Sequence, residues 1–142
     1  MRPFRVVLIL CACTVMMVIG RWSQAQSHTG KETAVVEFTD KTKVMGAVLY
    51  GKYFVVHDEA RMAKGEPCLF IYRYNEGEPL DQIEGQSGRL IVSFRCRHVD
   101  RSAAREPVLT LGMTSGADPS VLFELREIQL PGSTVGHQVP SL

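Results

Sequence analysis

The side chains in this sequence best suited to chemistry are two cysteines, two histidines and a methionine. Cys96 and His98 are two residues apart, so on a β-strand both would leave the same face, about 6.6 Å apart along it. His57, Met62 and Cys68 offer further ligands earlier in the chain. A Cys, His and Met set is typical of copper sites, and two Cys with two His are typical of zinc sites. These five residues therefore define a candidate copper or zinc site.

Residues 1–25 have the pattern of a secretory signal peptide. Two arginines, Arg2 and Arg5, precede an uncharged and mostly apolar run over residues 6–20. Small residues then occupy the positions three and one before Gln26, where we expect cleavage. The alternative is an uncleaved membrane anchor, but the run is shorter than the roughly 20 residues of a full span. The sequence thus predicts a protein that is exported, either periplasmic or secreted, with no membrane span after cleavage.

Export would leave Cys68 and Cys96 as the cysteines of the mature chain, in an oxidising compartment. An even pair in that setting predicts a disulfide. The bridge would close a loop of 29 residues, and such a loop contributes about 3.6 kcal/mol in the chain-entropy description. We favour this interpretation over the metal site, because the Cys-x-His pair lacks the nearby methionine that blue-copper sites have, and Cys68 has no close partner of the kind that zinc sites use. A bridge would also remove both thiolates from the ligand set.

The charge of the mature chain excludes several classes of partner. Cleavage removes three basic residues and leaves 13 basic against 15 acidic ones, a net charge of −2. Such a chain has no bulk attraction for nucleic acid or for an anionic membrane. The sequence also shows no nucleophile and base pair, phosphate-binding loop or dinucleotide fingerprint, so we expect no enzymatic activity.

Four arginines lie in one stretch, at Arg95, Arg97, Arg101 and Arg105. The first two would share the outward face of a strand, and the others would follow in a loop. They form a possible docking patch for another envelope protein or an anionic envelope polymer. The alternative, which the negative net charge favours, is a solvated face whose charges protect an edge strand from aggregation.

These side chains need a scaffold, and the alternation of apolar and polar residues predicts one made of short β-strands. Residues 34–39 form a first candidate strand. Residues 44–57 have the pattern of a β-hairpin that turns at Gly51-Lys52, since glycine suits the first central position of a type II′ turn. That turn would pair Leu49 with Phe54 and place both on the same core face.

The segment around the cysteines combines a short helical turn with two strands. Residues 58–64 are predicted to be the helical turn, with Asp58 as its cap and Gly65 ending it in the left-handed conformation. Residues 68–74 form the next strand, and residues 89–99 form a long strand with strict alternation. This long strand would carry the Cys-x-His pair on its apolar face.

The C-terminal third is less regular. Residues 107–114 are predicted to be a strand. Residues 121–130 fit a strand only if a bulge near Arg126 shifts its phase, and they fit a helix with Asp118 as its cap. We favour the strand because the neighbouring elements are all strands. Residues 131–142 have the composition of a loose tail, so no role is assigned to the histidine within them.

Six or seven short strands in about 100 residues predict an all-β fold, a small antiparallel β-sandwich or open barrel with one short helical turn. The β-domain would span residues 34–130. A flexible lead-in over residues 26–33 would precede it, and a flexible tail over residues 131–142 would follow it.

The run VVHDEARMAKGEPC from Val55 to Cys68, followed by VSFRC from Val92 to Cys96, resembles a group of small exported bacterial proteins of unknown function. The resemblance extends over residues 33–140. It implies an exported bacterial β-domain, and the group has no established activity to transfer.

The sequence therefore predicts a non-enzymatic binding or structural module of the cell envelope, stabilised by one disulfide and without a cofactor. The alternative is a periplasmic copper- or zinc-binding protein. Its ligands would come from His57, Met62, Cys68, Cys96 and His98.

Overall fold

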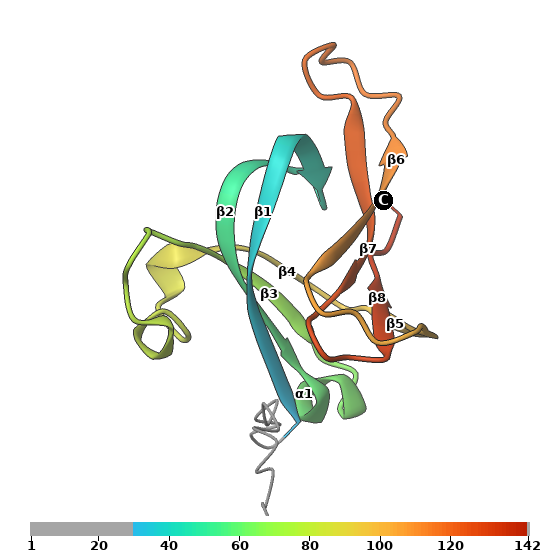
Figure 1. The fold of residues 1–142 in the computed structure, drawn as a ribbon. Coiled ribbons are helices and arrows are strands. Elements are labelled where there is room, and N and C mark those ends of the chain that lie inside the picture. Colours follow the sequence, from blue (N-terminus) through green and yellow to red (C-terminus); the bar gives the residue numbers. More distant parts are fainter. Residues whose placement is uncertain (1–29, 142) are drawn as a thin grey trace, which may run out of the picture.

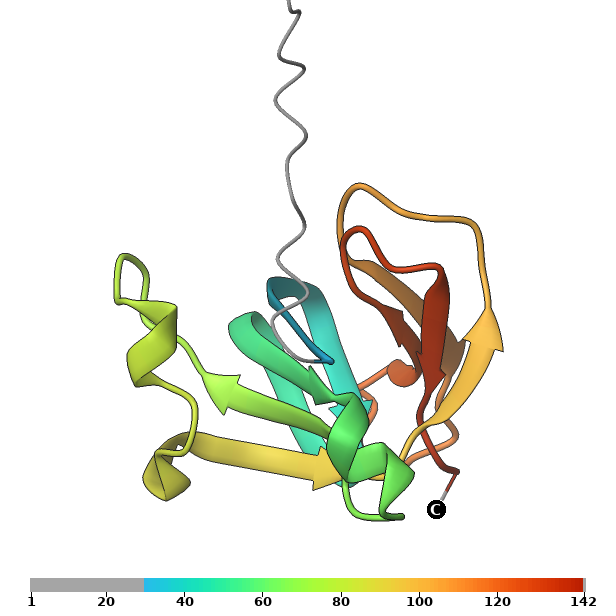
Figure 2. The same cartoon turned by 90° about the horizontal axis from the view of Figure 1, so that it is seen from below.

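One eight-stranded sheet makes up most of the protein, in a computed structural model that describes residues 30–141. The sheet curls into a half-barrel (Figures 1 and 2), which confirms the all-β prediction in its open-barrel form. The strands are β1 (Lys31–Val44), β2 (Ala47–Asp58), β3 (Leu69–Arg73), β4 (Leu90–Phe94), β5 (Arg97–Asp100), β6 (Val108–Met113), β7 (Phe123–Gln129) and β8 (Val135–Gln138). The helical elements are α1 (Glu59–Ala63) and the 3-10 turns η1 (Leu80–Gln82) and η2 (Ser87–Arg89).

The strand order is β4-β3-β2-β1-β7-β8-β5, with β6 paired to the other edge of β7. All pairs are antiparallel except β1 and β7, which run parallel over Thr42 and Lys43 of β1. The predicted signal peptide, residues 1–25, lies outside the described residues. The predicted lead-in, residues 26–33, is described only from residue 30, and its last three residues already belong to β1.

The first hairpin turns at Met45-Gly46, so the predicted turn at Gly51-Lys52 is wrong. Both central residues have positive φ, 48° for Met45 and 90° for Gly46, as a type I′ turn requires. Gly51 instead lies within β2 opposite Phe38, next to an irregularity in the β1–β2 register. Glycine occurs at both candidate turns. The turn at Met45-Gly46 forms because it allows nearly all of β1 to pair with β2.

This register also separates the residues that we expected on one face. Leu49 and Val55 belong to the larger apolar cluster, whereas Phe54 and Val56 belong to a second cluster. Successive residues of a strand point to opposite faces, so both faces of the sheet are covered here. The loop between β3 and β4 covers the second face with Ile83, which is fully buried.

The short helix follows its sequence prediction closely. The carboxylate of Asp58 accepts a hydrogen bond from the backbone N–H of Arg61, and Gly65 follows the helix with φ of 71°. These two residues supply the cap and the left-handed exit that a helix of this length needs. Because α1 is short, only ten residues connect the end of β2 with the start of β3, its antiparallel neighbour.

The predicted long strand over residues 89–99 is divided in two, because the chain leaves the sheet at Arg95 and Cys96. The first part, β4, pairs with β3, and the second part, β5, pairs with β8. The strict alternation predicted for this stretch is interrupted in β4, where the register against β3 skips Ile91 and both Ile91 and Val92 pack against the larger cluster. The break itself carries the chain from one end of the strand order to the other.

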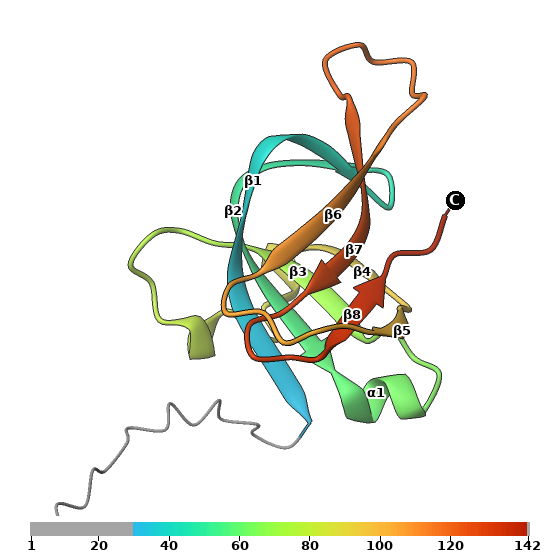
Figure 3. The same ribbon diagram turned by 45° about the vertical axis from the view of Figure 1, so that its right-hand side comes forward.

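From residue 107 onward the chain forms three strands, β6, β7 and β8, rather than two strands and a tail. Within the predicted segment 121–130, Phe123–Gln129 form β7, and its register against β6 skips Arg126, so both the strand and the bulge are confirmed. The interpretation of residues 131–142 as a loose tail is wrong over residues 135–138. They form β8, which lies between β5 and β7 (Figure 3), and its pairing with distant strands left no strong local signal.

The strand β6 pairs only with β7 and forms an edge of the sheet. Its side chains include the exposed apolar residues Val108, Leu111 and Met113, the last of them 70% exposed. The helical elements within residues 30–141 have five residues at most, and none is long enough to cross a membrane.

The turn at Met45-Gly46 makes a direct prediction. Asparagine tolerates positive φ better than methionine does, so Met45→Asn should relieve about 1 kcal/mol of backbone strain. The free energy of unfolding should rise by less than that, because Met45 also packs against the larger apolar cluster. Lys52→Asn is the matched control, since it creates the same Gly/Asn chemistry at the rejected turn, and it should not stabilise the protein. Urea unfolding measures both variants. A gain from Lys52→Asn alone would contradict the observed register.

Candidate metal site

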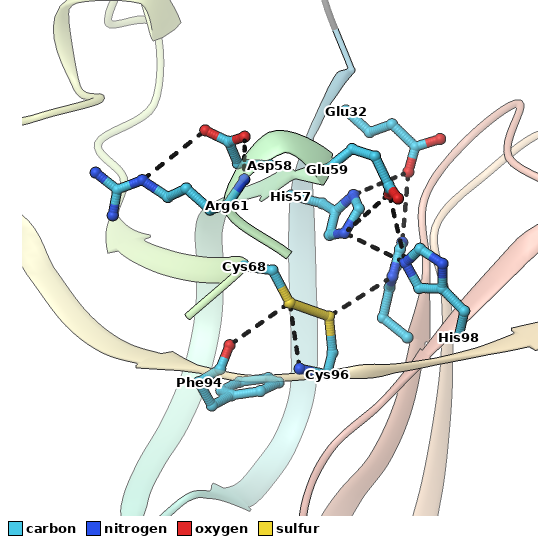
Figure 4. The surroundings of a disulfide bond; sticks show 10 residues. Glu32, His57, Asp58, Glu59, Arg61, Cys68, Phe94, Cys96 and His98 are labelled. Atoms are coloured by element: carbon cyan, nitrogen blue, oxygen red, sulfur yellow. Dashed lines mark hydrogen bonds and ion pairs between the residues drawn. A yellow bond between two sulfur atoms is a disulfide. The ribbon is translucent and has the colours of Figure 1, made fainter. Parts of the chain in front are cut away.

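A disulfide joins Cys68 and Cys96, as predicted, and their Cα atoms are 6.5 Å apart. Cys68 immediately precedes β3 and is fully buried, and Cys96 lies in the break between β4 and β5. The backbone N–H of Cys96 donates to the Cys68 sulfur at 3.2 Å, and the N–H of Cys68 donates to the carbonyl of Phe94 at 3.1 Å. The bridge therefore holds the break against the start of β3 (Figure 4).

Two cross-strand pairs face each other next to this bridge. Glu32 of β1 is directly opposite His57 of β2, and His98 of β5 is directly opposite His137 of β8. His57 follows Val55 on the face of the larger apolar cluster, and His137 pairs with Ile128 of the same cluster. The polar rings of these histidines thus lie at one end of the apolar core, next to it.

The three imidazole rings are in mutual contact. The ring centres of His57 and His137 are 4.0 Å apart, and that of His98 lies 5.3 Å and 5.0 Å from them. His57 is 2% exposed and His137 is fully buried. The Nε2 atoms of His57 and His98 face each other at 3.4 Å. Three histidines from three strands therefore share one small space.

Two carboxylates complete the cluster, and they contact different ring nitrogens. Glu32 Oε2 lies 3.6 Å from His57 Nδ1 and 3.4 Å from His137 Nε2. Glu59, the first residue of α1, places Oε2 3.6 Å from His98 Nε2 and 3.9 Å from His57 Nε2. Glu32 contacts Nδ1 of His57, whereas Glu59 contacts the Nε2 atoms of His57 and His98 (Figure 4).

Burial sets the protonation of the innermost histidine. Burial, and secondly the proximity of His137, lower the pKa of His57 to about 4, so its ring is neutral at pH 7. The hydrogen bond with His137 lowers the pKa of Glu32 below its ordinary value. A neutral imidazole beside a charged carboxylate has a free nitrogen lone pair, which is the form that binds a metal ion.

A cavity of about 190 Å³ opens over these side chains. Its lining includes Gly30, Glu32, His57, Glu59, His98 and His137. The space is large enough for an ion and water molecules, and it connects the buried histidines to the surface.

The site contains part of the predicted ligand set. Ligand atoms of His57, Cys96, His98 and His137 lie within 4.8 Å of one another. Met62 lies on α1 and is not among the residues that line the cavity. The Cys68 sulfur points away toward the Phe94 carbonyl, at 3.8 Å.

Sequence analysis missed His137, Glu32 and Glu59. His137 was assigned to a tail, because residues 135–138 have no strong strand signal of their own. The two glutamates had no signal of their own, because only the pairing of β1 with β2 and the cap of α1 bring them here.

We expected a Cys68–Cys96 bridge to dismantle a metal site that uses both thiolates. The bridge does occupy the Cys96 sulfur, which contacts His137 Nδ1 at 3.9 Å. Three imidazoles and a carboxylate remain, and that set needs no thiolate.

The four arginines of the predicted docking patch differ in whether their side chains are hydrogen-bonded within the fold. Arg101 makes two hydrogen bonds to the buried carboxylate of Glu127, at 2.7 Å and 2.8 Å, and Arg97 donates to the side chain of Gln138. Arg95 and Arg105 are exposed. Arg101 is therefore a structural residue, and its charge is balanced within the fold.

The fold and the cluster define a disulfide-bonded β half-barrel with a histidine site at one end of its core. Comparison of the chain with family models, with curated proteins and with solved structures gives no match.

The neutral state of His57 predicts how stability depends on pH. The unfolded chain takes up a proton at His57 below about pH 6.5, but the folded protein does so only near pH 4. The contribution of His57 is therefore complete above pH 6.5 and is lost as the pH falls toward 4, by up to about 3 kcal/mol. In urea unfolding with a chelator present, His57→Gln should flatten this decline. An unchanged slope would refute the assignment.

Proposed function

We propose that this protein is an exported β-domain that binds one divalent transition-metal ion, Zn²⁺ or Cu²⁺, at its histidine cluster. The observation that carries the proposal is the convergence of His57, His98 and His137 from three strands, two of them buried. Buried polar rings lose contact with water, and a shared metal ion compensates all three at once.

The distances suit such an ion. Two nitrogens bound tetrahedrally at 2.0–2.1 Å from zinc lie about 3.4 Å apart, and His57 Nε2 and His98 Nε2 are 3.4 Å apart. His137 offers Nδ1 from the β8 side, since its Nε2 is directed to Glu32. Glu59 is the fourth ligand in this arrangement, because its carboxylate lies against the same two Nε2 atoms.

Glu32 has a different role from Glu59. It accepts a hydrogen bond from His137 Nε2 and lies 3.6 Å from His57 Nδ1, and these contacts favour the tautomers that leave the other nitrogen of each ring free. Carboxylates in this position orient the imidazoles and increase their basicity. Glu32 is therefore a positioning residue for two ligands.

The ligand types favour zinc or copper over other ions. Imidazole nitrogen suits Zn²⁺ and Cu²⁺, whereas Mg²⁺ and Ca²⁺ require mainly oxygen ligands. The open cavity leaves a path for the ion and for water.

Export is part of the same proposal. It is supported by the leader pattern of residues 1–25 and by the disulfide, a bond that persists in oxidising compartments. We assign the domain a binding role and no catalytic one.

The first test is metal stoichiometry. The purified protein, freed of metal by a chelator and titrated with Zn²⁺ by calorimetry, should bind one ion per chain. His98→Gln should weaken binding at least about tenfold, because it removes one ligand. Its side chain is 29% exposed, so the fold should tolerate the change.

Arg73→Gln is the control, since Arg73 is an exposed residue at the end of β3 that does not line the histidine cavity. It should leave the Zn²⁺ affinity unchanged. Absence of stoichiometric binding, or an equal loss in both variants, would refute the site.

The role of Glu32 is tested separately. Glu32→Gln should lower the Zn²⁺ affinity about 10–100-fold, the usual effect of losing an orienting carboxylate. Glu37→Gln changes an exposed glutamate on the same strand and should have no effect. Equal affinities of the two variants would show that Glu32 does not position the ligands.

A further inference from the structure

The disulfide places a sulfur atom directly against the histidine cluster. Cys96 Sγ lies 3.9 Å from His137 Nδ1, and all four potential ligand atoms of Cys96, His57, His98 and His137 are within 4.8 Å of one another. A sulfur and a nitrogen bound to one tetrahedral ion lie about 3.6 Å apart, given bonds of 2.3 Å and 2.0–2.1 Å. The distance between Cys96 Sγ and His137 Nδ1 is thus a few tenths of an ångström longer than that between two ligand atoms of one ion.

We propose that reduction of the Cys68–Cys96 bridge converts the site into a Cys96, His57, His98 and His137 site that binds Cu⁺. The proposal rests on the metal-binding function proposed above and names a second ligand set for the same site. Thiolate is a soft ligand and selects Cu⁺, whereas the imidazole and carboxylate set of the bridged protein suits Zn²⁺ and Cu²⁺. The redox state of the bridge therefore selects the ion.

The two cysteines are not equivalent in this respect. Cys68 is fully buried, and its sulfur is directed toward the Phe94 carbonyl. Cys96 lies in the break between β4 and β5, outside the strand ladders, and is partly exposed. Once the bridge opens, the Cys96 side chain can adjust toward the histidines without disturbing a strand.

A reductant can reach the bridge from another side of the molecule. Cys96 lines a cavity of about 460 Å³ together with Arg95 and Arg97, and neither arginine lines the histidine cavity. The two guanidinium charges attract an anionic thiolate. This gives two of the arginines of the predicted patch a chemical role.

The reduction is balanced by a dithiol. Its thiolate attacks the Cys96 sulfur and the Cys68 sulfur leaves; the second thiol then releases Cys96 as the reductant closes to its own disulfide. Two electrons and two protons pass from the dithiol to the two cysteines. Cu⁺ then replaces the proton on the Cys96 thiol.

Two single variants separate the thiol from the loss of the bridge. Cys68→Ser leaves Cys96 free beside the histidines, whereas Cys96→Ser leaves only Cys68. Both lose the same cross-link. We expect Co²⁺ to give a near-ultraviolet thiolate-to-metal charge-transfer band with Cys68→Ser and with dithiothreitol-reduced wild type, but not with Cys96→Ser or oxidised wild type.

Affinity gives a second readout. In competition with a chromophoric Cu⁺ chelator, Cys68→Ser should bind Cu⁺ at least about tenfold more tightly than Cys96→Ser, because only Cys68→Ser keeps a thiolate beside the histidines. A folded Cys68→Ser protein without the charge-transfer band, or equal Cu⁺ affinities, would overturn the proposal.

If both variants fail to fold, the wild-type protein tests whether Cys96 becomes a ligand after reduction. Dithiothreitol-reduced protein should show the Co²⁺ band, and the same protein alkylated with iodoacetamide after reduction should not; a band absent from both samples would overturn the proposal. If oxidised wild type binds neither Zn²⁺ nor Co²⁺, the proposed function fails. If it binds them but Cys68→Ser shows no band, only the second ligand set fails.

Discussion

The break at Arg95 and Cys96 is the constraint on which this structure depends. It lets one stretch of chain pair with β3 on one side and with β8 on the other, and the Cys68–Cys96 bridge holds it in place. Without it, the alternation would continue as one straight strand and His98 would not lie opposite His137. The same two residues thus curve the sheet, join its outer strands through the chain, and bring the histidines together.

The sequence predicted what local chemistry determines. The cap at Asp58, the exit at Gly65 and the phase shift at Arg126 are signals within a few residues, and the structure has all three features. It did not predict the hairpin turn, because two glycines competed, or β8, because its burial comes from distant strands. The residues of the candidate site also fall into a group that local sequence predicts and a group that it does not. His57, Cys96 and His98 lie on predicted strands, but the partners of these residues depend on non-local pairing.

At one end of the core, the histidine cluster replaces apolar packing with contacts between polar rings. His57 follows Val55 on the same face of β2, and His137 lies opposite Ile128 of β7. Aliphatic side chains at these two positions would extend the apolar core without buried polar atoms. The pairs β1–β2 and β5–β8 meet there through side chains, since β2 shares no ladder with β5 or β8. A bound ion would cross-link these two parts of the sheet, and ligand binding to the folded state would add to stability.

The position of β6 has a consequence for how the protein behaves at high concentration. The outermost strands β4 and β5 are short and are joined by a link that carries an arginine, which makes them poor templates for another chain. β6 is six residues long, pairs along one side only, and carries the exposed side chains of Val108, Leu111 and Met113. Self-association of this fold by strand addition would therefore begin at β6, on a different strand from every ligand of the histidine cluster.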